Sequence, residues 1–505
     1  MNNTLRQTSA KEHVITILSR AFMIFSPFIL LLIVSMIIRH NAFNSFPVWS
    51  DEIDYWRALL SWDSVGYHKG YSGLFEILPA AGTLGVRGIT PILLYGWFVK
   101  LFGLTYSTIM TCNAVWISIA ALVFCLLHKP KPVVSLFFGA FIIAYVPIVL
   151  YCVTSMTELF NYALMLFYIT FLYSYHHTRS PWMLLLSSLV SIIGCMYRLP
   201  YFLLFIPIVL AFSNYKWGLK MILSFLVAML IAFGSCFIAS VFTAPNIAGF
   251  PYQLTQAPSL TILLQMLFGH TKSNLIDYFV KPCTTMETAF RILYFAVMGL
   301  CLLGTFIQLQ KTLKAFKPRF AFSREMLWCF LFLFAAFSFV VIFFETNDWR
   351  DYRILAPFLW MVVGYRIVRQ RFVIPSVALL LSLGAIVLLL TIEPVGAYND
   401  AARFEREALS ENITAAAASI TYDSDAADPL TNTVRIDLPS LQAAEELHPG
   451  LGLQYGWCTT ETTGKSNWIF TDVLKCVVNG YEPVTSLPNA KVYKLIEPYE
   501  VLTNE

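Results

Sequence analysis

Long apolar runs separated by short polar turns follow one another through residues 1–392. A helix needs about 20 apolar residues to cross roughly 30 Å of hydrocarbon, and most of these runs approach that length. They lie near residues 21–38, 106–127, 133–151, 159–175, 182–197, 200–213, 219–242, 289–309, 326–344, 354–368 and 372–392. The pattern predicts an all-α polytopic membrane protein with about eleven transmembrane helices.

One further apolar run, Gly88 to Gly103, is predicted to lie along the membrane instead of crossing it. At about 1.5 Å per residue it reaches only about 24 Å. If it does not cross and the amino terminus is inside, every basic cluster obeys the positive-inside rule, whereas a crossing would place them all outside. The inner loops then hold Lys129, Lys131, Arg179, Lys216, Lys220, Lys311, Lys314, Lys317, Arg319, Arg324, Arg366, Arg369 and Arg371. We therefore expect Ile89–Phe102 to form an outer juxtamembrane helix.

This arrangement divides the chain into a transmembrane domain (1–392) and an outer domain (393–505). Two large outer loops are expected within the first part, at 39–105 and 243–288. In the outer domain, Asp, Glu, Asn, Thr and Gly replace the apolar runs, and a small α+β fold is predicted. The expected pieces are helices at Asn399–Leu409 and Trp468–Val478 and strands at Ala418–Tyr422, Val434–Leu438 and Lys491–Ile496.

Composition agrees with a membrane protein, because 58% of the residues are hydrophobic and 13% are charged. Soluble domains average roughly 25% charged residues. The net charge of +4 comes from basic residues scattered in short loops, so no tract for binding nucleic acid is present. Most cysteines lie in apolar runs, where a thiol behaves as a small hydrophobe. Cys458 and Cys476 lie in the outer domain and are a candidate disulfide.

The densest group of acids outside the outer domain comes directly after the first apolar run. Asp51, Glu52 and Asp54 lie between Trp49 and Trp56. Tryptophan is expected at a membrane interface, so the aromatic residues indicate little by themselves. The paired acids Asp51 and Glu52 are the candidates for chemistry, whereas Asp54 is expected to be solvated or to cap a turn.

Several charged residues stay on the outer side once the basic clusters are placed inside. Arg198 lies between two apolar runs with almost no loop, and Arg350 and Arg353 lie in another tight outer turn. Arginine binds phosphate in a bidentate manner, and a cation at membrane depth is usually paired or functional. Glu158 opens the fourth span from the same side. We predict one outer cavity in which a carboxylate lies near a lipid-linked phosphate.

Structural roles for these residues remain alternatives. Glu158 can stabilise the first turn of its helix, because a carboxylate there opposes the helix dipole. Arg198 can extend to lipid headgroups. Arg350 can pair with Asp348 or Asp351.

Taken together, these motifs resemble the integral-membrane glycosyltransferases of the GT-C class. Asp51-Glu52 followed by Tyr55 is similar to the acidic motif of their first outer loop. Thr90 to Tyr95, continuing to Lys100-Leu101-Phe102-Gly103, resembles the juxtamembrane segment of protein O-mannosyltransferases and lipid A aminoarabinose transferases, although Thr90 replaces the first of two prolines. The positions of Glu158, Arg198-Leu199-Pro200 and Arg353 with Pro357 also resemble motifs of that superfamily.

The resemblance implies an inverting transferase that takes a sugar from a polyprenyl-phosphate donor at the outer face. It also implies an enzyme of the bacterial plasma membrane that acts on cell-envelope glycans. It implies Asp51 as the catalytic base, Glu52 and Glu158 as residues that orient the acceptor or a divalent ion (Mg or Mn), and Arg198, Arg353 and Arg350 as ligands of the lipid phosphate. The acceptor class stays open between glycan, lipid and protein. The outer domain is expected to help bind the acceptor.

Two rival functions fit the same topology. A polysaccharide polymerase or ligase also acts on lipid-linked glycans, but relies more on outer-loop arginines and histidine than on an acid pair. A lipid-linked sugar transporter or flippase typically shows repeated halves and ionisable or broken segments at mid-membrane. This chain keeps its candidate charges at one face, which favours the enzyme.

Overall fold

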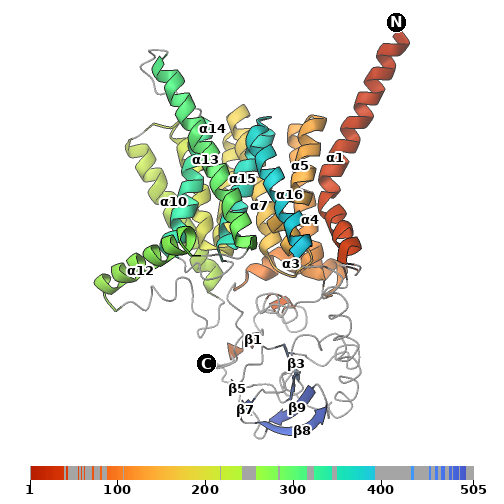
Figure 1. The fold of residues 1–505 in the computed structure, drawn as a ribbon, viewed down its shortest axis with the longest axis vertical. Coiled ribbons are helices and arrows are strands. Elements are labelled where there is room, and N and C mark those ends of the chain that lie inside the picture. The colour runs from red at the N-terminus through yellow and green to blue at the C-terminus, as the bar shows by residue number, and fades with distance from the viewer. Residues whose placement is uncertain are drawn as a thin grey trace.

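The computed structural model describes most of residues 2–392 and a set of strands in the last part of the chain. The described ranges are 2–38, 41, 43, 55, 58–59, 62, 71–72, 80–81, 88–105, 107–216, 218–241, 258–281, 285–314, 324–343, 350–392, 434–436, 454–455, 461–463, 468–471, 477–479, 481–487 and 490–495. The described part is mostly helical, and the helices form one bundle (Figure 1).

A helix or helix pair overlaps every predicted span. These are α1 (Asn2–Ile38), α4 (Thr108–His128), α5 (Pro132–Ala144) with α6 (Val146–Tyr151), α7 (Glu158–Thr178), α8 (Pro181–Tyr197), η3 (Leu199–Leu204) with α9 (Phe205–Phe212), α10 (Leu219–Ser240), α13 (Thr285–Lys314), α14 (Arg324–Phe343), α15 (Arg350–Val368) and α16 (Val373–Ile392). Six described helices are long and apolar enough to cross a membrane by length and composition: α1, α4, α10, α13, α14 and α16. A multi-helix membrane domain is therefore confirmed, and the count of eleven spans stays a prediction.

Two helices lie outside the predicted spans. The first, α3 (Thr90–Phe102), has 13 residues and falls on the predicted juxtamembrane segment. It lies at the lower end of the bundle (Figure 1), and it packs against α4. At 1.5 Å per residue it extends only about 20 Å, which is too short to cross a bilayer. The second, α12 (Leu260–Phe279), occupies a segment predicted only as outer loop, and Asn274 Nδ2 anchors it by donating to the Val341 carbonyl at 2.8 Å.

The centre of the bundle is α7. Side chains all around this helix are buried, and it packs against α4, α8 and α15. A helix covered on every side is typical of the interior of a large bundle. In contrast, α10 exposes large apolar side chains such as Leu230 and Phe237, which is the surface expected of a helix that faces lipid. Both ends of α7 therefore lie where several helices meet, and each end carries charged residues.

The described residues after 392 form strands. In one sheet the order is β4 (Gln454–Tyr455), β3 (Val434–Ile436), β6 (Trp468–Thr471), β9 (Ala490–Leu495) and β8 (Tyr481–Leu487), and a smaller sheet pairs β5 (Glu461–Thr463) with β7 (Val477–Asn479). The β3 and β9 strands agree with the predicted strands. The predicted helix Trp468–Val478 is wrong, because Trp468–Thr471 pairs with both β3 and β9. Its Trp-Ile-Phe-Thr sequence has the aromatic and β-branched residues that favour strands.

Other predictions for this part of the chain lie outside the described residues. They are the helix Asn399–Leu409, the strand Ala418–Tyr422 and the Cys458–Cys476 pair. The α+β class of the outer domain therefore stays a prediction. The seven cysteines within the described residues are all free.

Candidate active site

A buried ion pair joins the start of α7 to the turn after α8. Arg198 Nη2 donates to Glu158 Oε1, and the two side chains are only 8% and 2% exposed. Each partner also keeps unused hydrogen-bonding capacity, because Glu158 Oε2 and Arg198 Nε are buried and have no hydrogen-bond partner. Burial without full hydrogen bonding is costly for charged groups. The pair is therefore equipped to bind a further polar group.

Local backbone structure fixes both charges. Glu158 is in the first turn of α7, and the preceding Thr157 uses its hydroxyl to bind the Tyr197 hydroxyl instead of capping the helix. Arg198 has extended backbone (φ −151°, ψ 129°) directly after α8, and its N–H donates to the Gly194 carbonyl at 2.7 Å. A Cβ on Gly194 would lie 2.9 Å from Tyr201 Cβ. Glycine thus permits the close turn that brings Arg198 to Glu158.

A second arginine reaches the same region from α15. Arg353, in the first turn and a half of that helix, forms a side-chain hydrogen bond with Tyr151 at the end of α6. The Tyr151 phenol also lies within electrostatic range of Glu158 and Arg198. Tyr151 therefore links the two arginines, which come from segments more than 150 residues apart in the chain. This proximity was predicted from the sidedness of the outer charges.

Further tyrosines and an asparagine surround the ion pair. Tyr95 of α3 donates to Asn113 Oδ1 at 2.9 Å, and Asn113 Nδ2 donates to the Met156 carbonyl at 2.8 Å, which ties α3 and α4 to the turn before Glu158. Tyr55 is 2% exposed and lies within electrostatic range of both Arg198 and Tyr95. The first outer loop therefore reaches the ion pair at Tyr55.

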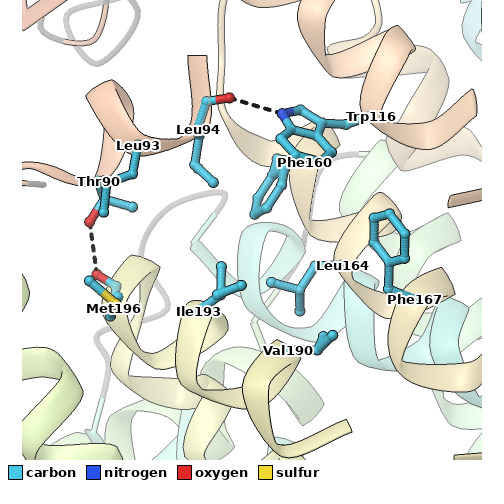
Figure 2. Close-up of a pocket in the computed structure, with 10 residues that line it drawn as sticks. All are labelled: Thr90, Leu93, Leu94, Trp116, Phe160, Leu164, Phe167, Val190, Ile193 and Met196. Atoms are coloured by element: carbon cyan, nitrogen blue, oxygen red, sulfur yellow. Dashed lines mark hydrogen bonds between the residues drawn. The ribbon is translucent and has the colours of Figure 1, made fainter. Parts of the chain in front are cut away.

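An apolar cavity of about 310 Å³ lies beside this polar group. It is formed between α3, α4, α7 and α8 (Figure 2) and is lined by Thr90, Leu93, Leu94, Trp116, Phe160, Leu164, Phe167, Val190, Ile193 and Met196. Its polar atoms are occupied, because Thr90 donates to the Met196 carbonyl at 3.1 Å and Trp116 Nε1 to the Leu94 carbonyl at 3.0 Å (Figure 2). Leu93 is 54% and Ile193 42% exposed, so these two residues lie at the open side of the cavity.

The cavity and the ion pair are adjacent in the chain as well as in the fold. Met196 in the cavity wall is two residues before Arg198. Phe160, also in the wall, packs against the Tyr197 ring with centroids 6.2 Å apart, and the Arg198 guanidinium lies 5.3 Å from that same ring. An apolar molecule in the cavity would therefore have its end close to two charged groups. A ligand with an apolar tail and an anionic head matches this order of surfaces.

Not every predicted site residue is within the described part of the chain. Asp51 and Glu52 lie outside it, and for Arg350 only the helical backbone of α15 is described. The described residues contain no cluster of three or more His, Cys, Asp or Glu side chains that fits a metal ion. Glu158 faces the Arg198 guanidinium, which by like-charge repulsion disfavours a divalent cation at that carboxylate.

Sequence reasoning missed three residues of this site: Tyr151, Tyr197 and Asn113. The signal for Asn113 was present, because an amide within an apolar run is a polar group at membrane depth that needs a partner. Tyr151 and Tyr197 gave no comparable signal, since tyrosine is frequent at the ends of membrane helices.

The chain was compared with protein families, curated sequences and solved structures, and only solved structures match it. No protein-family model and no curated protein sequence matches the chain. Among solved structures, the chain is similar to ArnT from Cupriavidus metallidurans bound to undecaprenyl phosphate, with a TM-score of 0.47, 12% identity, and coverage of 92% of this chain and 97% of that chain. It is also similar to ArnT in the apo state, with a TM-score of 0.35, 13% identity, and coverage of 79% and 66%.

ArnT is a lipid A aminoarabinose transferase, which is one of the kinds of protein that the sequence motifs resemble. Both TM-scores are below 0.5 and both identities are far below 25%. The similarity therefore assigns neither a substrate nor the role of any residue in this chain.

Proposed function

We propose that the chain is an inverting, GT-C-type glycosyltransferase that moves a sugar from a polyprenyl-phosphate donor to an acceptor at the outer face of the membrane. One observation supports this most: Arg198 and Arg353 both lie within electrostatic range of Tyr151, and Tyr197, next to Arg198 in the chain, packs against Phe160 in the wall of the apolar cavity. Lipid-linked sugars have the matching shape, with an apolar tail that stays in the bilayer and an anionic head.

In this proposal the arginines bind the donor phosphate. The unpaired Nε of Arg198 donates to a phosphate oxygen, and Arg353 adds a second cation on the Tyr151 side. Glu158 positions Arg198 through Oε1 and keeps Oε2 to accept a hydrogen bond from the acceptor. As the bond between the anomeric carbon and the phosphate oxygen breaks, negative charge grows on the phosphate, and both guanidiniums stabilise that charge.

The acid pair of the first outer loop supplies the base. Asp51 and Glu52 precede Tyr55 by four and three residues, and four residues of chain reach at most about 14 Å. Tyr55 is in electrostatic range of Arg198, so the length of the chain allows Asp51 to reach the ion pair. We assign Asp51 to remove the proton of the acceptor hydroxyl as that oxygen attacks the anomeric carbon from the side opposite the phosphate, which inverts the configuration.

A Mg or Mn ion would find its ligands in Asp51 and Glu52, and it would neutralise phosphate charge when bound. Arg350 is a further proposed phosphate ligand from the same turn as Arg353. The acceptor is a hydroxyl-bearing glycan, lipid or protein.

Filling the apolar cavity is expected to weaken the use of long-chain donors. Ile193→Trp places an indole at the open side of the cavity, where it displaces the isoprene units nearest the phosphate. Lost contacts of one or two methylenes cost about 1–3 kcal/mol in such pockets, so we expect KM for a polyprenyl-phosphate sugar to rise about 10- to 100-fold. The measurement is transfer of a radiolabelled sugar by purified protein in nanodiscs.

Leu185→Trp is the matched control, because Leu185 is 47% exposed on the same helix and does not line the cavity. It should leave KM unchanged. Equal KM values for Ile193→Trp and the wild type would show that the donor tail does not bind in the cavity.

We further propose that the amino terminus is cytoplasmic and that residues 393–505 form an extracytoplasmic domain. The proposal rests on the basic clusters, which obey the positive-inside rule only in this orientation. Single cysteines introduced within 39–87 or 400–500 should react with a membrane-impermeant maleimide added to intact cells, and those within 311–324 should react only after lysis. Labelling of 311–324 in intact cells would reverse the assigned orientation.

A further inference from the structure

A second group of charged residues lies at the opposite end of α7 from the ion pair. Glu158 begins this helix and Arg179 follows its last residue, Thr178. At 1.5 Å per residue, 21 residues place the two ends about 31 Å apart, which is close to the thickness of a bilayer core. The two groups of charges therefore face opposite leaflets, and the proposed transferase mechanism uses only the first.

Arg366, in the last turn of α15, is the central residue of this second group. Its side chain is only 8% exposed, and its Nε and Nη1 atoms are buried without a hydrogen-bond partner. It lies within electrostatic range of Cys301 on α13 and Cys329 on α14, which are neutral thiol neighbours and not counterions. A guanidinium held in this way has a desolvation cost that the described groups around Nε and Nη1 do not offset.

The surroundings add positive charge. The described residues that share this electrostatic neighbourhood are Arg179, Arg324, Arg366, Arg369, Arg371 and a single carboxylate, Glu325. Glu325 is already engaged, because its Oε1 accepts from Arg369 Nη2 at 2.8 Å. Segment 315–323, which leads into α14, contains no Asp or Glu in its sequence. Within the part of the chain that the structure describes, the carboxylates near Arg366 are therefore too few to balance these cations.

Aromatic rings hold the neighbouring guanidiniums in place. Arg324 lies 5.3 Å from the Tyr215 ring centroid and Arg369 lies 5.9 Å from that of Tyr173. Cation–π contacts of this kind fix the position of a guanidinium without neutralising it. The group is thus a fixed set of donors with an excess of positive charge at the ends of three membrane helices, α7, α14 and α15.

We propose that Arg366 and its neighbours form a binding site for a phosphate group, supplied by the headgroup of an anionic phospholipid in the leaflet opposite the active site. A phosphate accepts two parallel hydrogen bonds from one edge of a guanidinium, either Nε with Nη2 or Nη1 with Nη2. Arg366 has a donor without a partner on each of these edges, Nε on one and Nη1 on the other. Basic pockets between transmembrane helices are known to bind such headgroups. Free inorganic phosphate has the same chemistry and is the other source that the experiment distinguishes.

The test uses the full chain in nanodiscs of phosphatidylcholine, alone or with phosphatidylglycerol, and reads lipid retention by native mass spectrometry after mild detergent extraction. We expect the wild type to retain phosphatidylglycerol over phosphatidylcholine by about ten-fold or more, as expected for one charge-assisted bidentate contact. Arg366→Met should reduce this preference to near unity. Lys131→Met is the matched control, because it removes an exposed cation at the same membrane face and should leave the preference unchanged.

A second arm adds inorganic phosphate to protein in phosphatidylcholine alone and measures the melting temperature. An increase in melting temperature that Arg366→Met abolishes would identify free phosphate as a ligand of the site. No increase, together with phosphatidylglycerol retention that depends on Arg366 in the first arm, would identify the lipid headgroup as the ligand. If Arg366→Met fails to fold, Arg366→Lys keeps the charge, loses the bidentate geometry and should show an intermediate preference. Equal lipid retention by the wild type and both Arg366 variants, without a phosphate effect, would overturn the proposal.

Discussion

Replacing Asp51 with asparagine is expected to abolish sugar transfer while leaving the protein folded and able to bind its donor. Asparagine keeps the size of aspartate, but it cannot take the proton of the acceptor hydroxyl. Loss of a general base typically reduces the rate by about 10²- to 10⁴-fold. The measurement is kcat for transfer from a polyprenyl-phosphate sugar, together with donor affinity and the melting temperature, both of which should stay at wild-type values.

Asp54→Asn is the matched control, since Asp54 lies three residues away in the same acidic stretch and has no proposed part in the reaction. Its kcat should remain within a few-fold of the wild type. Transfer at the wild-type rate by Asp51→Asn would remove this residue from the mechanism. If Glu52→Gln showed the loss expected for Asp51→Asn, the base would have to be reassigned within the acid pair.

Breaking the Glu158–Arg198 pair is expected to cause the largest loss of stability among single substitutions in the described helices. Glu158→Ala leaves a buried arginine without its counterion, and Arg198→Ala leaves a buried carboxylate. Removing one partner of a buried pair costs about 3–5 kcal/mol of unfolding free energy. Arg198→Ala should also weaken donor binding, because it removes a proposed phosphate ligand.

A double substitution separates stability from chemistry. Glu158→Leu with Arg198→Met removes both charges and fills the site with apolar groups of similar size, so the unfolding free energy should recover to near the wild-type value. Sugar transfer should stay lost. A double variant with normal transfer would show that the pair is only structural, and an unchanged donor affinity in Arg198→Ala would assign the phosphate to other residues.

Much of the membrane domain follows from the sequence, because helix positions depend on local apolar runs. Each predicted span overlaps a helix, and Ile89–Phe102 forms the short helix expected of it. The predicted helix Trp468–Val478 was wrong because local sequence did not decide its structure. Its mixture of apolar and polar residues fits either period over so short a stretch, and pairing with strands far away in the chain decided the outcome in favour of β6.

The site was predicted less completely, because its geometry comes from contacts between distant segments. Sidedness placed Glu158, Arg198 and Arg353 at one face of the membrane, but nothing in the sequence paired Glu158 with Arg198 across 40 positions. The resemblance gave Glu158 the role of orienting the acceptor or a divalent ion, and the pairing adds the positioning of an arginine to its proposed role. Tyr151, which connects Arg353 to the pair, had no sequence signal because its contribution depends on where α15 packs.

The position of the phosphate in an experimental structure of the protein with a bound polyprenyl phosphate tests the central claim most directly. We expect the phosphate within hydrogen-bonding distance of both Arg198 and Arg353, the first isoprene units in the cavity between α3 and α8, and the Asp51 carboxylate facing the phosphate across the space for the sugar. A phosphate bound away from both arginines, with Asp51 pointing into solvent, would contradict the proposed transferase site.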